Sequence, residues 1–105
     1  MTEALVVFVT TPTAERAAEL ARALVEERLA ACGNVVPGLR SIYRWEGKVH
    51  DEGEALLVLK TTRARFEALR ERVLALHPYQ VPEVIALPIE AGSAPYLAWI
   101  AAETA

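Results

Sequence analysis

Three side chains in this sequence could bind a soft or borderline metal ion, namely Cys32, His50 and His77. No two of them lie within five residues of each other, whereas structural zinc sites use closely spaced pairs of cysteine and histidine. The spacing therefore does not predict a closed zinc site. Cys32 follows Ala30-Ala31 at a predicted helix end, which favours a buried, unreactive thiol. A pairing of Cys32 with His77 as nucleophile and base stays open.

The two histidines lie in different settings. His50 precedes Asp51 and Glu52 in a predicted hairpin loop, which is typical of a solvated loop or of a weak metal site. His77 precedes Pro78 at the predicted end of a helix, where its charge could complement the helix dipole or its ring could ligate a metal. Such a turn histidine is expected to contribute little to packing.

The sequence lacks the motifs of common catalytic sites. It has no G-x-S-x-G nucleophile turn and no glycine-rich phosphate loop, and its five glycines are scattered. The adjacent carboxylates Glu26 and Glu27 lie in a predicted helix and are interpreted as solvated surface charge. We therefore expect a binding protein rather than an enzyme.

Residues 41–48 combine tyrosine, tryptophan and charged side chains in one predicted strand. Tyr43 and Trp45 fall on the same face of that strand, which is typical of a binding edge or of a subunit contact. Aromatic packing between strands is the alternative. Lys60 ends an otherwise apolar strand, and in a cleft it would pair with a carboxylate such as Glu54 or Glu83. A lysine that extends from the strand end into solvent is the simpler interpretation.

The composition indicates one folded domain over residues 1–105. Apolar residues make up 53% of the chain and charged residues 24%, which excludes intrinsic disorder. The 11 basic and 14 acidic residues give a net charge of −3 without a basic cluster, so nucleic-acid binding is not expected.

The chain is not expected to cross or leave through a membrane. The longest apolar run, Ala4–Val9, is far shorter than the roughly 20 residues of a membrane helix, and no basic region precedes it. One cysteine permits no disulfide within the chain, which agrees with a reducing cytoplasm.

The positions of apolar and turn residues predict four strands and three helices. A buried strand is expected at 4–10, and a helix follows from residues 11–13 to about 31, where Gly33-Asn34 would end it. A strand then starts at 35, is bent or bulged at Pro37-Gly38, and continues through 41–46. It forms a hairpin with a strand at 55–60. After the hairpin we expect a helix that ends at 77, a strand at 83–88 and a helix over 93–100.

This β-α-β-β-α-β order with a terminal helix predicts an α+β fold, the ferredoxin-like sandwich with an antiparallel sheet. Both main helices would cover the same face of the sheet. Strands 4–10 and 55–60 are nevertheless apolar at consecutive positions, so both of their faces require burial. A partner subunit is the natural cover for the second face.

The chain resembles the divalent-cation tolerance protein family (CutA) in a series of short segments that span nearly its whole length. They are Val-Thr-Thr-Pro at 9–12, Leu-Ala-Ala-Cys at 29–32 with Asn34 and Pro37-Gly38, Ser-Ile-Tyr-x-Trp-Glu-Gly-Lys at 41–48, Leu-Lys-Thr-Thr at 59–62, His-Pro-Tyr-x-x-Pro-Glu at 77–83, and Tyr-Leu-x-Trp at 96–99. Each segment alone is weak evidence, but together and in this order they are specific.

The resemblance implies a ferredoxin-like fold assembled as a compact homotrimer, similar in architecture to the PII signalling proteins, and we expect it in the cytoplasm. It also implies copper binding and a role in resistance to copper and other divalent heavy metals. Some relatives carry a cysteine and a second histidine where this chain has Val9 and Leu76, so only His77 matches those metal positions. We expect His77 to ligate the metal with Glu83, which lies six residues on across a turn.

The clefts between subunits are then expected to contain Tyr43, Trp45, Lys60 and Tyr79 beside His77 and Glu83. The alternative function is a trimeric PII-like signalling or scaffold module whose cleft binds a small anion or a protein partner. The sequence alone identifies neither the physiological ligand nor the metal.

Overall fold

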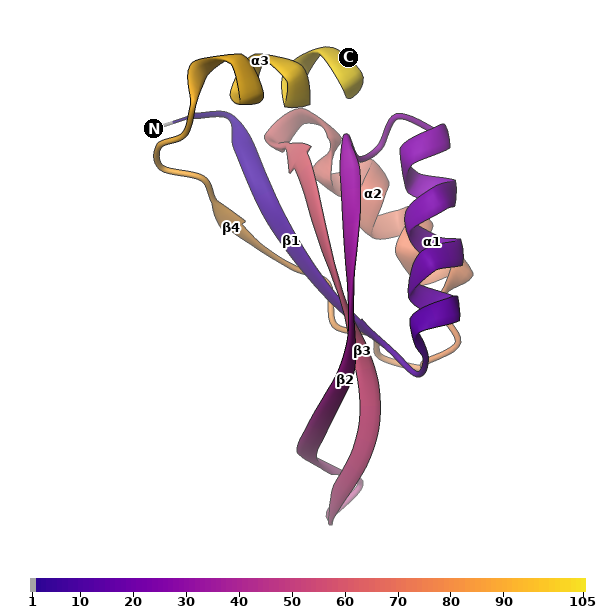
Figure 1. Ribbon diagram of the computed structural model, residues 1–105. Coiled ribbons are helices and arrows are strands. Elements are labelled where there is room, and N and C mark those ends of the chain that lie inside the picture. The colour runs from indigo at the N-terminus through magenta and orange to yellow at the C-terminus, as the bar shows by residue number, and fades with distance from the viewer. Residues whose placement is uncertain (1) are drawn as a thin grey trace.

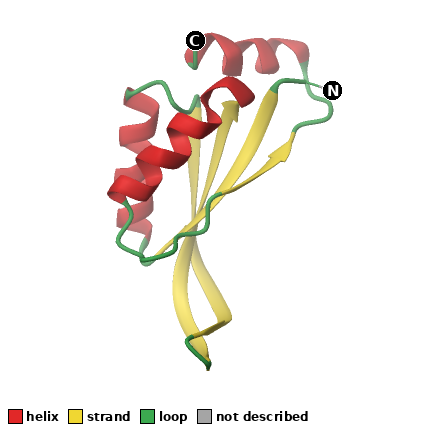
Figure 2. Ribbon diagram, turned by 180° about the vertical axis from the view of Figure 1, so that it is seen from behind, coloured by secondary structure: helices red, strands yellow, loops and turns green. Residues whose placement is uncertain are grey.

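Four antiparallel strands form one sheet in the order β2-β3-β1-β4. The structure is a computed structural model that describes residues 2–105. Its elements are β1 (Ala4–Thr11), α1 (Ala14–Glu26), β2 (Cys32–Trp45), β3 (Lys48–Thr62), α2 (Arg63–Leu76), β4 (Ile85–Pro88) and α3 (Ala94–Glu103). The view from behind shows α1 and α2 on one face of the sheet (Figure 2). The predicted α+β order of strands and helices is confirmed.

The core lies between the sheet and these two helices. Alternate residues of the two central strands point into it, so Val7 and Val9 of β1 and Leu57 and Leu59 of β3 are fully buried. The helices supply Ala17, Leu20, Ala21 and Leu24 from α1 and Leu69 and Val73 from α2. Each large apolar side chain buried in this way stabilises the fold by roughly 1.5–3 kcal/mol.

The first helix is shorter than predicted, because a Schellman motif ends it at Glu26 instead of residue 31. Arg28 adopts a φ of 60°, and the Leu29 N–H donates to the Leu24 carbonyl at 2.9 Å. An arginine at this left-handed position carries no sequence signal for the end of a helix.

Gly33-Asn34 was expected to end that helix, and this expectation is wrong because both residues lie inside β2. A Cβ on Gly33 would approach the Ala21 Cβ to 2.8 Å, so glycine is required for the close contact between β2 and α1. β4 is also shorter than the predicted 83–88, and α3 spans Ala94–Glu103 rather than 93–100.

The strands β2 and β3 form a long hairpin whose far half projects beyond the rest of the sheet (Figure 1). Its turn residues Glu46 and Gly47 have φ values of 50° and 79°, as in a two-residue type I′ turn. The predicted bulge is confirmed, because the register shifts between Val36 and Leu39. The hairpin therefore bends where it leaves the sheet.

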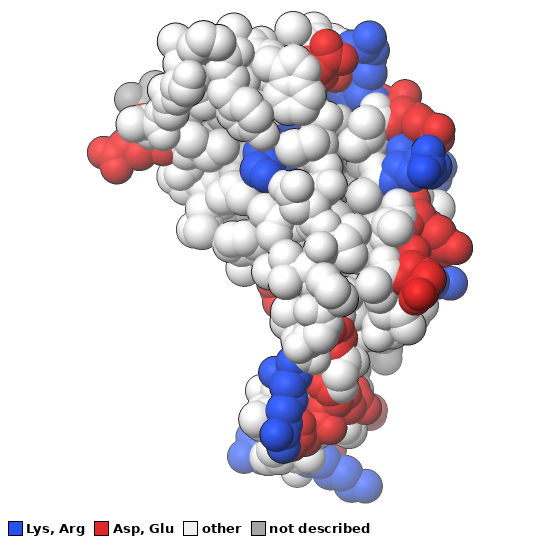
Figure 3. Space-filling view, in the orientation of Figure 1, with Lys and Arg blue, Asp and Glu red and all other residues white. Residues whose placement is uncertain are grey.

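The sheet face opposite α1 and α2, here called the open face, is mostly apolar and uncovered. It carries half-buried Val6, Phe8, Leu56 and Val58 and exposed Val36, Ile85 and Leu87. Figure 3 shows a broad uncharged surface with one basic group in its middle. The register puts Lys60 on this face, and its Nζ donates to Asn34 Oδ1. Neither Glu54 nor Glu83, the carboxylates considered for a cleft lysine, is therefore the partner of Lys60.

The closing helix α3 lies across one end of the sheet (Figure 1). Its Ile100 is fully buried against Ala4 and Ala31, and Arg65 of α2 donates to the Thr104 carbonyl at 2.7 Å. Among residues 2–105, no helix has both the length and the apolar composition needed to cross a membrane.

Candidate functional site

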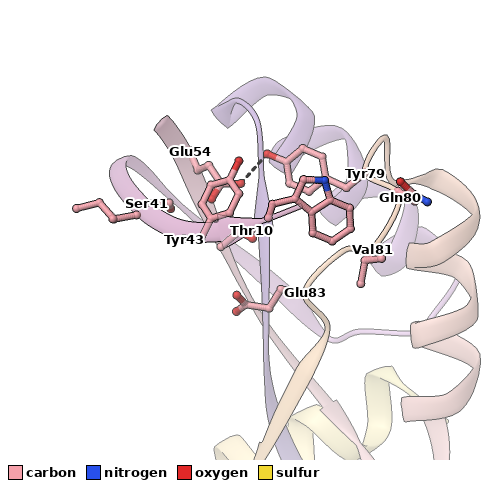
Figure 4. A pocket seen from close by; sticks show the side chains of 10 residues that line it. Thr10, Ser41, Tyr43, Glu54, Tyr79, Gln80, Val81 and Glu83 are labelled. Atoms are coloured by element: carbon pink, nitrogen blue, oxygen red, sulfur yellow. Dashed lines mark hydrogen bonds between the residues drawn. The ribbon is translucent and has the colours of Figure 1, made fainter. Parts of the chain in front are cut away.

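A cavity of about 490 Å³, here called the acidic pocket, opens at the root of the hairpin. Four segments line it, and Figure 4 shows their side chains. They are Thr10 of β1, Ser41, Ile42, Tyr43 and Trp45 of β2, Glu54 of β3, and Tyr79, Gln80, Val81 and Glu83 of the loop between α2 and β4.

The bulged hairpin positions one wall of the acidic pocket. Beyond the bulge, Tyr43 and Trp45 lie on the same face of β2, as the alternation predicts. Glu54 lies two residues before Leu56 along β3, so both side chains are on the open face. The Tyr79 hydroxyl donates to Glu54 Oε2 at 2.5 Å, and this bond links the loop to the hairpin (Figure 4).

Negative charge dominates the acidic pocket. Tyr43 donates its hydroxyl to Glu52, and this hydrogen bond raises the pKa of Tyr43 to about 12. Burial, and then the bond to Glu54, raise the pKa of Tyr79 as well. Burial and, after it, the charge of Glu54 raise the pKa of Glu83 above its ordinary value of 4.5. None of the described lining residues is Lys, Arg or His, so the pocket suits a positive ligand.

His77 lies behind this pocket with both ring nitrogens already hydrogen-bonded. The side chain is 8% exposed, Nε2 lies 2.7 Å from the Thr10 carbonyl oxygen, and the Tyr79 N–H donates to Nδ1 at 3.1 Å. The ring also packs on that of Tyr79 with centroids 4.7 Å apart. The expectation that His77 contributes little to packing is therefore wrong, while its role as a metal ligand stays a prediction.

The structure brings most of the predicted cleft residues together. Tyr43, Trp45, Tyr79 and Glu83 all line the acidic pocket. Lys60 does not, because it lies six positions along β3 from Glu54, or about 20 Å along an extended strand.

Cys32 lies near neither His77 nor the acidic pocket. It pairs with Lys60 at the other end of the sheet, where its Sγ is 3.7 Å from the Tyr96 hydroxyl. Lys60 also pairs with Val6 of β1, so Cys32 lies level with Val6. His77 instead contacts Thr10, which is four residues further along β1. A nucleophile-base pair of Cys32 and His77 is thus excluded by the fold.

Sequence reasoning named Glu54 only as a possible partner of Lys60 and did not place it among the predicted metal ligands or cleft residues. The signal for Glu54 in the sequence was its spacing of two residues from Leu56 and four from Val58, which puts a carboxylate on an otherwise apolar face of the strand. Thr10 and Val81 gave no comparable signal, because each looks like an ordinary strand or loop residue.

One chain offers an incomplete set of metal ligands. Among residues 2–105, no group of three or more His, Cys, Asp or Glu side chains is arranged to hold a metal ion. His50 stacks on Tyr43 with ring centroids 5.1 Å apart. Glu54 and Glu83 supply two carboxylates in one cavity, which oxygen-binding divalent cations use, but further ligands must come from water or from another chain.

Comparison with known proteins gives consistent matches. The family model described as CutA1 divalent ion tolerance protein matches residues 5–103. The divalent-cation tolerance protein CutA of Thermus thermophilus is 58% identical over 99 residues, which cover 94% of this chain and 96% of that protein. Human protein CutA is 50% identical over 93 residues, or 89% of this chain.

Solved structures agree with the sequence matches. The divalent cation tolerance protein of Thermus thermophilus superposes with a TM-score of 0.94 at 56% identity, covering 97% of this chain and 99% of that one. CutA of Xylella fastidiosa gives 0.96 at 40% identity, with 99% and 100% covered. The chain spans about half the length of its human and Arabidopsis relatives, with 52% and 53% covered. On this evidence, the chain belongs to the CutA1 divalent ion tolerance family.

Proposed function

We propose that this chain acts as a cytoplasmic homotrimer that binds copper or another divalent cation and contributes to resistance to heavy metals, without catalysing a reaction. The family to which it belongs supports a connection with divalent cations. The observation that carries the proposal is the acidic pocket, where Glu54 and Glu83 face one cavity that no basic side chain among the described residues lines. Mutual repulsion between two carboxylates is relieved by a bound cation.

The pocket provides the anionic ligands, and assembly or water completes the coordination. Glu83 has no hydrogen-bond or ion-pair partner among residues 2–105, so its oxygens are available. His77 can bind a metal only after its ring releases the Thr10 carbonyl or the Tyr79 N–H. Cu²⁺ is the strongest first-row probe for such a site, because affinities of nitrogen and oxygen ligands rise toward copper.

The open face supports the homotrimer. Ile85 is 53% exposed and Leu87 51% exposed in the single chain, beside half-buried Phe8 and Val58. An uncovered apolar surface of this kind, rimmed by polar residues, marks an interaction site. Copies of the same chain arranged around a threefold axis can cover it in every subunit, and the projecting hairpin can then reach a neighbouring subunit.

The alternative, a PII-like module that binds a small anion or a protein partner, has less support. An anion requires basic groups, and the basic group of the open face, Lys60, is hydrogen-bonded to Asn34 and lies away from the acidic pocket. Basic groups for an anion would have to come from a neighbouring subunit. Because the described lining of the pocket supplies none, we rank this function second.

Sedimentation equilibrium combined with dialysis tests the proposal on one sample. We expect a mass of three times 11.5 kDa, and after dialysis against Cu²⁺ we expect copper retained in proportion to the chain. A monomer at micromolar concentration would contradict the assembly. A trimer that retains no copper beyond the dialysis buffer would contradict cation binding and favour the PII-like alternative.

A further inference from the structure

We propose that His77 is a positioning residue. Its neutral ring, with the hydrogen on Nε2, bridges β1 to the loop between α2 and β4, and it does not itself ligate a metal ion. This loop, residues 77–84, carries Tyr79 and Glu83 of the candidate site. All contacts that support the inference lie within one chain, so they do not depend on assembly or on cation binding.

The two partners of the His77 ring determine which nitrogen carries the hydrogen. A backbone N–H can only donate, and that of Tyr79 lies 3.1 Å from Nδ1, so Nδ1 has its lone pair free to accept. A carbonyl oxygen can only accept, and that of Thr10 lies 2.7 Å from Nε2, so Nε2 carries the hydrogen. A doubly protonated ring has no acceptor for the Tyr79 N–H, and the opposite tautomer makes neither bond. The geometry therefore selects one form of the ring.

The 77–84 loop depends on this bridge because its own backbone provides little support. Outside the helices and strands, residues 78–83 make no backbone-to-backbone hydrogen bond with the rest of the described chain, and Pro78 and Pro82 have no N–H to donate. A second anchor is the Tyr79 hydroxyl, which donates to Glu54 Oε2 of β3 at 2.5 Å. The bonds through His77 and Tyr79 therefore connect β1 to the loop and the loop to β3.

The same two bonds oppose metal ligation by His77. A metal ion needs a ring lone pair directed at it, but the lone pair on Nδ1 accepts from Tyr79 and Nε2 carries a hydrogen. Ligation would break one of these bonds and leave a backbone group unpaired beside a ring that is 8% exposed. His77 therefore acts on the candidate site through Tyr79, whose ring it also contacts with centroids 4.7 Å apart.

Nuclear magnetic resonance of the whole protein labelled with nitrogen-15 histidine tests the form of the ring directly. The nitrogen shifts of a neutral imidazole differ according to which nitrogen carries the hydrogen, and His50→Ala identifies the signals of His77. We expect one form, with the hydrogen on Nε2, and the same form after addition of Zn²⁺ as a diamagnetic divalent probe. A ring protonated on Nδ1, or loss of the Nε2 hydrogen on addition of Zn²⁺, would overturn the inference.

Hydrogen exchange of the Tyr79 N–H tests whether the ring holds the loop. His77→Ala removes the acceptor and should speed this exchange about tenfold or more, whereas His77→Asn retains an oxygen that can accept from the N–H two residues on. The exchange should therefore be slower in His77→Asn than in His77→Ala. The control His50→Ala should change it by less than about twofold. Equal exchange in wild type and His77→Ala, or in the two His77 variants, would overturn the bridge.

Titration of the same variants with Cu²⁺ connects the bridge to cation binding, and this part rests on the proposed function. If His77 positions the loop, His77→Asn should retain more copper affinity than His77→Ala, although an amide is a poor ligand for copper. Equal losses in the two variants would assign His77 as a ligand and overturn the inference. If wild type binds no copper, the proposed function is contradicted, while the ring form and the exchange rates still decide the inference.

Discussion

Replacing Ile85 with glutamate is expected to convert the proposed trimer into monomers at micromolar concentration. Ile85 lies on the edge strand β4 of the open face, next to Phe8 of β1. In a covered open face the new carboxylate would be buried without a partner, and by symmetry this cost would recur in every subunit. An unpaired buried charge costs several kcal/mol, which exceeds what one apolar contact contributes.

Ala68→Glu is the matched control for this substitution. Ala68 is exposed on α2, on the opposite side of the sheet, so the same added charge there should leave the mass unchanged. Sedimentation equilibrium measures both variants, and circular dichroism checks that each is folded. A folded Ile85→Glu protein that keeps the wild-type mass would mean that the open face is not the interface.

The substitution His77→Ala is expected to lower the free energy of unfolding by about 2–4 kcal/mol. It removes a buried ring, leaves the Thr10 carbonyl without its donor, and leaves the Tyr79 N–H without its acceptor. Because Thr10 and Tyr79 both line the acidic pocket, the change should also loosen the site.

Urea unfolding at a fixed protein concentration measures this loss, since the stability of an oligomer depends on concentration. His50→Ala is the control. The half-buried ring of His50 stacks on Tyr43 but has no hydrogen-bond partner among the described residues, so its removal should cost less than about 1 kcal/mol. A loss for His77→Ala no greater than that for His50→Ala would show that the buried ring is not a structural support.

The order of strands and helices could be predicted because the spacing of apolar residues and the positions of turn residues indicate each element. β1 and β3 alternate between two apolar faces, and Pro37-Gly38 marked the bulge at the root of the hairpin. The end of α1 could not be predicted, because an arginine occupies the left-handed position that glycine usually takes. The role of Gly33 depends on a tertiary contact with Ala21 that no local pattern reveals.

The candidate site was predictable only in part. Tyr43, Trp45, Tyr79 and Glu83 stood out by residue type, and the fold brings them into one cavity. Lys60 stood out equally, but its position along β3 keeps it away from that cavity. His77 showed suitable ligand chemistry in the sequence, while its buried hydrogen bonds become visible only in three dimensions.

The raised pKa of Glu83 should give the proposed cation binding a defined pH dependence. Burial and the neighbouring charge of Glu54 make Glu83 take up its proton at a higher pH than its ordinary 4.5. As the pH falls through that raised value, Glu83 becomes neutral and Cu²⁺ affinity should fall. In Glu83→Gln this part of the pH dependence should be absent.

Calorimetric titration of the purified protein with Cu²⁺ at neutral pH tests most directly whether the acidic pocket is a cation site. The samples are wild type, Glu83→Gln and the surface control Glu26→Gln. We predict saturable binding in wild type and in Glu26→Gln, and an affinity lower by about tenfold or more in Glu83→Gln, because one of two anionic ligands is lost. The same copper affinity in all three proteins would contradict this site, and no saturable binding in any of them would contradict the proposed function.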